Sequence, residues 1–124
     1  MVIVDTSVWV DSRRVRDDRL DVWIARDEIL QHPFVTAELG MGSFRSTSER
    51  DHLIDLLDSF AQIMVAGHQD FHAYVADSAL YGTGIGFADA HLLHACADNP
   101  ATQLATRDKR LAGQARRLRI EVLD

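Results

Sequence analysis

The 124 residues, 47% hydrophobic and 26% charged, fit a single globular domain spanning 1–124 and leave no room for a second. The formal net charge of −6 argues against a generally basic surface for nucleic acid. No apolar run approaches the ~18 residues of a membrane span, no signal-peptide pattern is present, and the single Cys96 excludes an intrachain disulfide. We therefore expect a cytoplasmic protein with no membrane contact.

The first half of the chain alternates short apolar runs with stretches of helical period. The β-branched run Val2–Val4 predicts a buried strand, and the residues after it, Asp5-Thr6-Ser7, form a helix-start sequence. The other elements expected in this half are helices over 8–12 and 19–29, a strand at 34–35, a helix that Thr36 caps and that carries Glu38, and a helix over 48–60.

The second half continues the same alternation. It predicts a strand at 63–65, a helix over 70–80, a glycine-rich loop at 82–86, a helix over 89–97, a strand at 104–106, a helix over 108–117 and a strand at 120–123. Short, continuously apolar strands between amphipathic helices indicate an α/β fold. We expect three α/β/α layers around a central, mostly parallel sheet.

Four carboxylates fall at the ends of expected strands or at the helix starts beside them. Asp5 follows the first strand and Glu38 lies in the first turn after 34–35. Asp89 opens the helix after the glycine-rich loop, and Asp108 comes one residue after the strand at 104–106. Sites in α/β sheets form at the carboxyl ends of the strands, so we expect these four acids to share one edge of the sheet.

The chemistry of four clustered acids differs from that of one. A single Asp at a strand–helix junction is explained as an N-cap that contributes about 1 kcal/mol. Four together repel, raise one another's pKa and destabilise the fold unless a cation neutralises them. Mg²⁺ binds oxygen ligands, typically a few carboxylates with waters and phosphate oxygens. The residues by themselves therefore indicate a metal–carboxylate site acting on phosphate, with Mn²⁺ as an alternative to Mg²⁺.

Four segments, in order and spacing, also resemble the motifs of PIN-domain nucleases, and together those of the toxin in VapBC-type toxin–antitoxin pairs. They are Val2–Trp9, Thr36–Leu39, Gly86–Leu93 and Leu104–Leu111. The match covers essentially the whole chain. One departure is Arg110, at a position where many relatives carry a further acid, which leaves a four-acid site.

The resemblance implies an endoribonuclease toxin that hydrolyses RNA and inhibits growth or translation. Asp5, Asp89 and Asp108 would hold one or two metal ions, with Glu38 as a further ligand or a water-orienting base. The resemblance also implies a homodimer held inactive by a cognate antitoxin, often through an arginine that reaches the acidic pocket.

Hydroxyl side chains beside these acids are candidates for orienting them by hydrogen bonds. They are Thr6, Ser7 and Thr106, for which helix capping and strand-end packing are equally good explanations.

Two other functions stay open. One is a non-catalytic nucleic-acid-binding or regulatory module on the same fold, and the other is a metal-dependent DNA nuclease or phosphatase. The four acids favour an enzyme, because a binding module gains nothing from unneutralised carboxylates. The small size leaves little room for elements that grip a DNA junction.

Other residues suggest less specific roles. His91 and His94 lie three apart on an expected helix, but without a third ligand at zinc spacing we expect a surface or hydrogen-bonded pair. Cys96 is expected in the core. The basic residues, all arginine except Lys109, bunch near both ends of the chain. They are interpreted either as phosphate-binding edges or as exposed faces paired with nearby acids.

Overall fold

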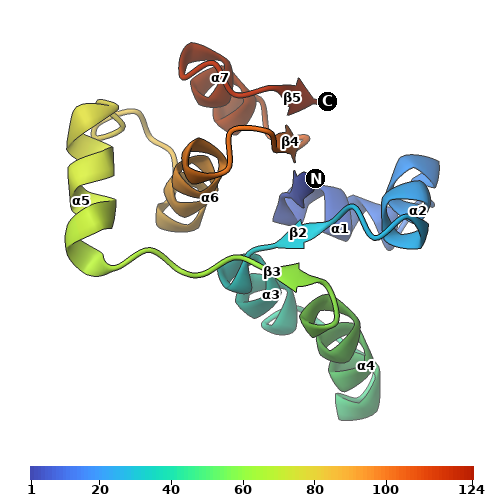
Figure 1. Ribbon diagram of the computed structural model, residues 1–124. Helices are drawn as coiled ribbons and strands as arrows, with labels where there is room; N and C mark the ends of the chain where they lie inside the picture. Colours follow the sequence, from blue (N-terminus) through green and yellow to red (C-terminus); the bar gives the residue numbers. More distant parts are fainter.

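The computed structural model describes residues 1–124 as seven helices and five short strands (Figure 1). The strands are β1 (Val2–Val4), β2 (Leu30–Gln31), β3 (Ala61–Gln62), β4 (Gln103–Ala105) and β5 (Val122–Leu123). The helices are α1 (Thr6–Ser12), α2 (Asp18–Ala25), α3 (Pro33–Gly40), α4 (Thr47–Asp58), α5 (His68–Asp77), α6 (Phe87–Asp98) and α7 (Lys109–Arg117). None of the helices has the length and apolar character needed to span a membrane.

All strand pairs are parallel, as the sequence predicts. β1, β4 and β5 form one sheet, and β2 pairs with β3. A parallel bridge between Val2 and Ile29, with a 2.7 Å hydrogen bond from the Val2 N–H to the Glu28 carbonyl, joins the two groups. The resulting order is β3-β2-β1-β4-β5. From β1 the chain first adds strands on one side of the sheet and then, from β4 on, adds them on the other side, so the topological switch point lies between β1 and β4. Such a switch point is where α/β proteins place their ligands.

Helices cover both faces of the strands. Figure 1 shows α1 and α2 on one side and α5 and α6 on the other, which confirms the three-layer arrangement. The strand β1 is buried throughout its length, so its residues are continuously apolar rather than alternating. Fully buried side chains from strands and helices meet around it, among them Ile3, Val8, Leu93, Leu104 and Leu111.

The expected strand at 34–35 is wrong, because this segment is the first turn of α3. Pro33 occupies the first helical position, where its missing N–H costs nothing. The Nδ1 atom of His32 caps the helix by accepting a 3.0 Å hydrogen bond from the Phe34 N–H. The strand of this region is instead β2, four residues earlier, and α2 ends at Ala25, before Asp27 turns the chain with a φ of 55°.

Most other elements are found with boundaries shifted by a few residues from expectation. The strand β3 precedes the expected 63–65, although the Ile63 N–H still bonds to the Gln31 carbonyl at 2.9 Å. The helix α4 begins at Thr47 because the Ser46 hydroxyl caps it. Asp89 is the third residue of α6, not the first, since the helix starts after Gly86.

Aromatic rings pack α3 against α6 and α5. The ring of His91 stacks on Phe71 with centroids 3.8 Å apart and meets the edge of Phe34 at 4.7 Å. Phe34 in turn stacks on Phe87 at 5.5 Å. Because α3 carries Glu38 and α6 carries Asp89, this cluster brings two of the candidate acids to the same edge of the sheet.

Burial of His32 makes stability depend on pH. Burial, and then the nearby His91, lowers the pKa of His32 from 6.5 to about 4. Between these values the unfolded chain takes up a proton that the folded protein excludes, so the free energy of unfolding falls as the pH drops from 6.5 towards 4. At about 1.4 kcal/mol per pKa unit, the loss is on the order of 3 kcal/mol.

The variant His32→Asn isolates this contribution, because Asn also caps a helix. We expect its unfolding free energy, measured by urea denaturation across this pH range, to decline less than that of the wild type. Parallel declines in the two proteins would contradict the assignment.

Candidate active site

Asp5 lies at the switch point, directly after β1. Its backbone N–H bonds to the Ala105 carbonyl at 2.9 Å, which ties it to the end of β4. Its side chain is 4% exposed and, although Asp5 is the N-cap residue of α1, makes no capping hydrogen bond. The carboxylate is oriented instead by two hydroxyls, from Ser7 at 2.7 Å and Thr106 at 2.8 Å, which both donate to Oδ2. Helix capping therefore does not explain Asp5.

Ser7 and Thr106 also fix the loop between β4 and α7. The Thr106 Oγ1 accepts a 3.0 Å hydrogen bond from the Asp108 N–H, and the Ser7 Oγ accepts one of 3.0 Å from the Arg107 N–H. Each hydroxyl thus links Asp5 to the backbone that precedes α7. The Thr6 hydroxyl is buried and has no hydrogen-bond partner in the protein.

Asp108 caps helix α7, as is common for an Asp at a strand–helix junction. Its Oδ1 atom accepts hydrogen bonds from the N–H groups of Arg110 at 2.8 Å and Leu111 at 3.2 Å. Only Oδ1 is used for capping. The exposed carboxylate therefore keeps Oδ2 for another ligand.

Asp89 is the electrostatic centre of the four acids. Burial, followed by the negative charges of Asp5, Asp108 and Glu38, raises the pKa of Asp89 from 3.8 to about 7. Burial and the charge of Asp5 also raise the pKa of Glu38, against the opposing effect of the nearby Thr6 hydroxyl. The structure therefore brings the four acids within range of mutual repulsion. No group of three or more Asp, Glu, His or Cys side chains anywhere in the chain is close enough to form a ready-made metal cage.

A cavity of about 380 Å³ opens beside Asp89 and Asp108. The glycine-rich loop forms its opposite wall, with Gly84 at a φ of +82°. The Arg110 guanidinium donates a 3.0 Å hydrogen bond to the Gly84 carbonyl. Arg110 therefore holds the glycine-rich loop against the start of α7.

Arg107 has a structural role that the sequence interpretation missed. Its guanidinium pairs with Asp11 of α1 at 3.4 Å and with the buried Asp17, which precedes α2, at 3.2 Å. Asp17 is also the N-cap of α2 and pairs with Arg19 at 3.4 Å. The sequence interpretation considered pairing of arginines only with nearby acids, because nothing in the sequence indicates a partner 90 residues away.

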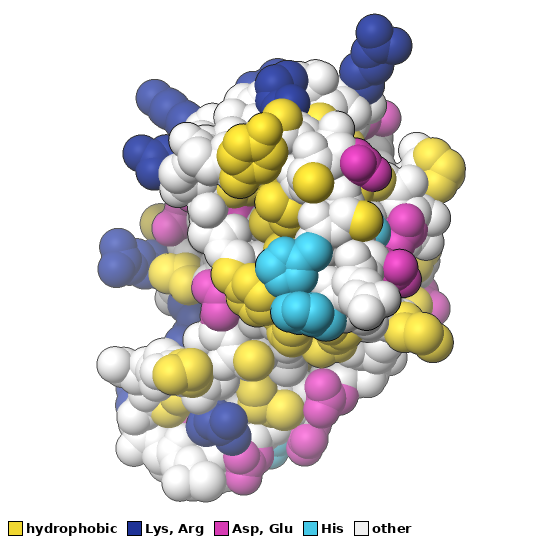
Figure 2. All heavy atoms as spheres, turned by 90° about the vertical axis from the view of Figure 1, so that its left-hand side faces the viewer, with side chains coloured by type: hydrophobic (Ala, Val, Ile, Leu, Met, Phe, Trp, Pro, Cys, Tyr) yellow, Lys and Arg dark blue, Asp and Glu magenta, His cyan; other side chains and the backbone are white.

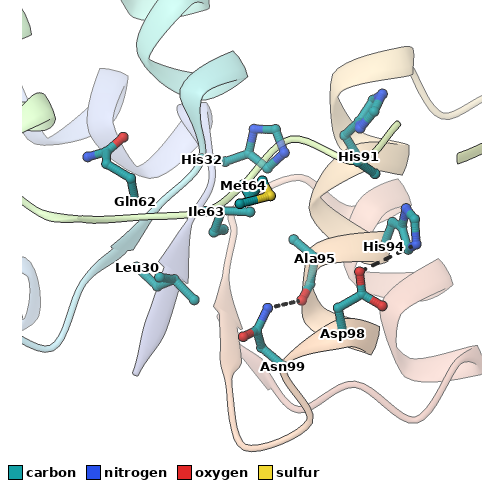
Figure 3. A pocket seen from close by; sticks show the side chains of 11 residues that line it. Leu30, His32, Gln62, Ile63, Met64, His91, His94, Ala95, Asp98 and Asn99 are labelled. Carbon is teal, nitrogen blue, oxygen red and sulfur yellow. Dashed lines mark hydrogen bonds and ion pairs between the residues drawn. The ribbon is translucent and has the colours of Figure 1, made fainter. Parts of the chain in front are cut away.

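The expectation of a surface or hydrogen-bonded histidine pair is wrong. His91 and His94 are both buried, and the Nδ1 atoms of both lack a hydrogen-bond partner. Figure 3 shows His94 directed towards Asp98, with their Nε2 and Oδ2 atoms 3.6 Å apart. The His94 ring also stacks on Tyr74 at 4.5 Å. These histidines thus serve as core aromatics beside a cavity of about 270 Å³, and Cys96 is buried as expected.

Sequence comparison gives two related findings. Residues 2–117 match the family described as PIN domain. Ribonuclease VapC32 of Mycobacterium tuberculosis, from strains CDC 1551 / Oshkosh and ATCC 25618 / H37Rv, is 40% identical over 111 residues, which cover 90% of this chain and 87% of the relative.

Two solved structures share the fold. FitAcB from Neisseria gonorrhoeae superposes with a TM-score of 0.64 at 19% identity, covering 100% of this chain and 97% of that chain. PAE2754 from Pyrobaculum aerophilum gives a TM-score of 0.63 at 19% identity, covering 91% of this chain and 83% of that one. At this identity they support the architecture alone.

Proposed function

Since this chain belongs to the PIN domain family, we propose that it is a metal-dependent endoribonuclease and the toxin of a toxin–antitoxin pair, as its homologue VapC32 is a ribonuclease. One observation carries the proposal. Asp89 is partly buried among three further carboxylates at the sheet's switch point, so that its pKa rises to about 7. Such repulsion persists in a folded protein when the acids serve a cation or a reaction.

The donor set fits Mg²⁺ or Mn²⁺. All the candidate ligands are oxygen atoms, and the Thr6 hydroxyl adds a buried polar atom beside Glu38. Mg²⁺ keeps several waters and uses few carboxylates, so it does not require a closed cage. Asp5, Asp89 and Asp108 would hold the ion. When bound, it supplies an activated water and stabilises charge on the leaving oxygen.

The side chains divide the remaining work. Ser7 and Thr106 hold the Asp5 carboxylate in one orientation, and Asp108 offers Oδ2 while Oδ1 caps α7. Glu38 has a raised pKa and lies next to Asp5, which suits its carboxylate to accept the proton of an attacking water.

A cognate antitoxin and a second copy of the chain are the proposed partners. An antitoxin arginine suits this site, because a guanidinium makes charge-assisted hydrogen bonds with carboxylates and relieves their repulsion. We place the enzyme in the cytoplasm, where it would act on cellular RNA and inhibit growth.

Cleavage of labelled single-stranded RNA of mixed sequence tests the proposal. We expect internal cleavage with Mg²⁺ or Mn²⁺ and none with excess EDTA, and no cleavage of DNA of the same sequence. Undiminished cleavage in EDTA would overturn the metal requirement. Cleavage of the DNA alone would overturn the assignment to RNA.

A further inference from the structure

Two cavities meet at the start of α7. The cavity beside Asp89 has a volume of about 380 Å³, and its neighbour, lined by Thr106, Arg107 and Arg116, has one of about 530 Å³. Asp108 and Lys109 line both. Lys109 is therefore the one cation common to the two hollows on either side of a candidate catalytic acid.

The other cations of these cavities already have partners. Arg107 is paired with two acids, one on α1 and a buried one that precedes α2. Arg116 pairs with Asp124, and Arg110 bonds to the Gly84 carbonyl. These three arginines therefore stabilise the fold and the glycine-rich loop.

Lys109 is different because it is exposed and its side chain makes no ion pair or hydrogen bond in the structure. It is also the only lysine in a chain with twelve arginines. A lysine ammonium is a compact charge with three donors on a flexible stem, which suits a phosphate whose position varies with the bound sequence.

The charge of the whole protein gives such a cation a role. The net charge is −6, so the protein as a whole repels a phosphodiester strand, and a cation beside the four acids adds to the attraction that a bound metal ion would supply. Figure 2 shows Lys and Arg side chains mostly along the left and upper margins of one face, whereas its centre carries histidine and apolar side chains and its right-hand side carries acidic ones. A polyanion such as RNA therefore meets favourable cations only at limited parts of the surface.

We infer that Lys109 binds a backbone phosphate of the RNA next to the scissile bond and so positions the strand across Asp108. This inference rests on the proposed ribonuclease function and specifies how its substrate is held. The contact is independent of base sequence, since it reads only the phosphate.

Binding of a single-stranded RNA in EDTA, followed by fluorescence anisotropy across a salt series, tests the inference. For Lys109→Gln we expect a several-fold weaker affinity, with a log–log salt dependence shallower by about 0.7. In Mg²⁺ the same variant should raise KM with little change in kcat, because the lost contact exists before and during the reaction. Lys109→Arg should restore most of the binding.

Arg26→Gln is the matched control. Arg26 is exposed after α2, makes no ion pair and lines neither cavity, yet its loss changes the net charge equally. Equal effects of the two glutamine variants, or no effect of Lys109→Gln, would overturn the inference and leave the ribonuclease proposal standing. A wild-type protein that neither binds nor cleaves RNA would overturn both.

Discussion

Asp89→Asn is expected to abolish RNA cleavage, by at least about 100-fold, while making the metal-free protein more stable. Metal sites lose about 10–100-fold in affinity or activity even when an outer hydrogen-bond partner is lost, so loss of a charged ligand should have a larger effect. Asn nearly preserves the volume of Asp, and Asp89 makes no capping bond that the change could remove. The fold should therefore survive.

The gain in stability follows from the pKa of Asp89. This group titrates near 7 in the folded protein and at 3.8 ordinarily, so the wild-type free energy of unfolding falls as the pH rises from 3.8 through 7. The variant lacks this fall. Its advantage should be greatest above pH 7 and should vanish below 3.8. The shift corresponds to about 4 kcal/mol, which solvent screening of the partly exposed carboxylate reduces to the order of 2 kcal/mol. Urea denaturation in EDTA at several pH values measures it.

Asp70→Asn provides a matched control. Asp70 is the third residue of α5 after a glycine N-cap, as Asp89 is the third residue of α6 after another glycine, but it is exposed and outside the acid cluster. Its change should leave cleavage intact and reduce stability by a few tenths of a kcal/mol through the helix dipole. If Asp89→Asn keeps wild-type cleavage at limiting Mg²⁺, the proposed site is wrong. Asp5→Asn should behave like Asp89→Asn in cleavage.

Thr106→Val is expected to reduce RNA cleavage about 10–100-fold and to raise the Mg²⁺ concentration for half-maximal activity. The change keeps the side-chain shape but removes the hydroxyl that donates to Asp5 and accepts from the Asp108 N–H. Both bonds orient proposed ligands. Stability should fall by about 1–3 kcal/mol, because two polar groups each lose a partner.

The shift in Mg²⁺ dependence separates an orienting role from a merely structural one. Thr106→Ser keeps a hydroxyl and should recover most of the activity at low Mg²⁺. Thr102→Val is the control, since Thr102 is buried at the opposite end of β4 and its hydroxyl makes no hydrogen bond. A Thr106→Val protein with unchanged Mg²⁺ dependence would show that the hydroxyl does not orient the ligands.

The sequence by itself determined the parallel α/β architecture and the edge on which the four acids lie. The strand β1 was predictable because it is buried on both faces and is therefore apolar at every residue. The cap at Asp108 was predictable because capping depends on residues within one turn. Buried strands and helix caps of this kind are visible in the sequence because they depend only on neighbouring residues.

Tertiary structure decided the features that depend on distant partners. Strands as short as β2 and β3 have too little pattern to locate, so pairing of Leu30 with Ala61 and the cap at His32 placed them. The pairing of Arg107 with Asp17 and the hydroxyl link from Thr106 to Asp5 span 90 and 101 residues. Such contacts leave no local periodicity, because they form only when packing of the sheet brings β1 and β4 together.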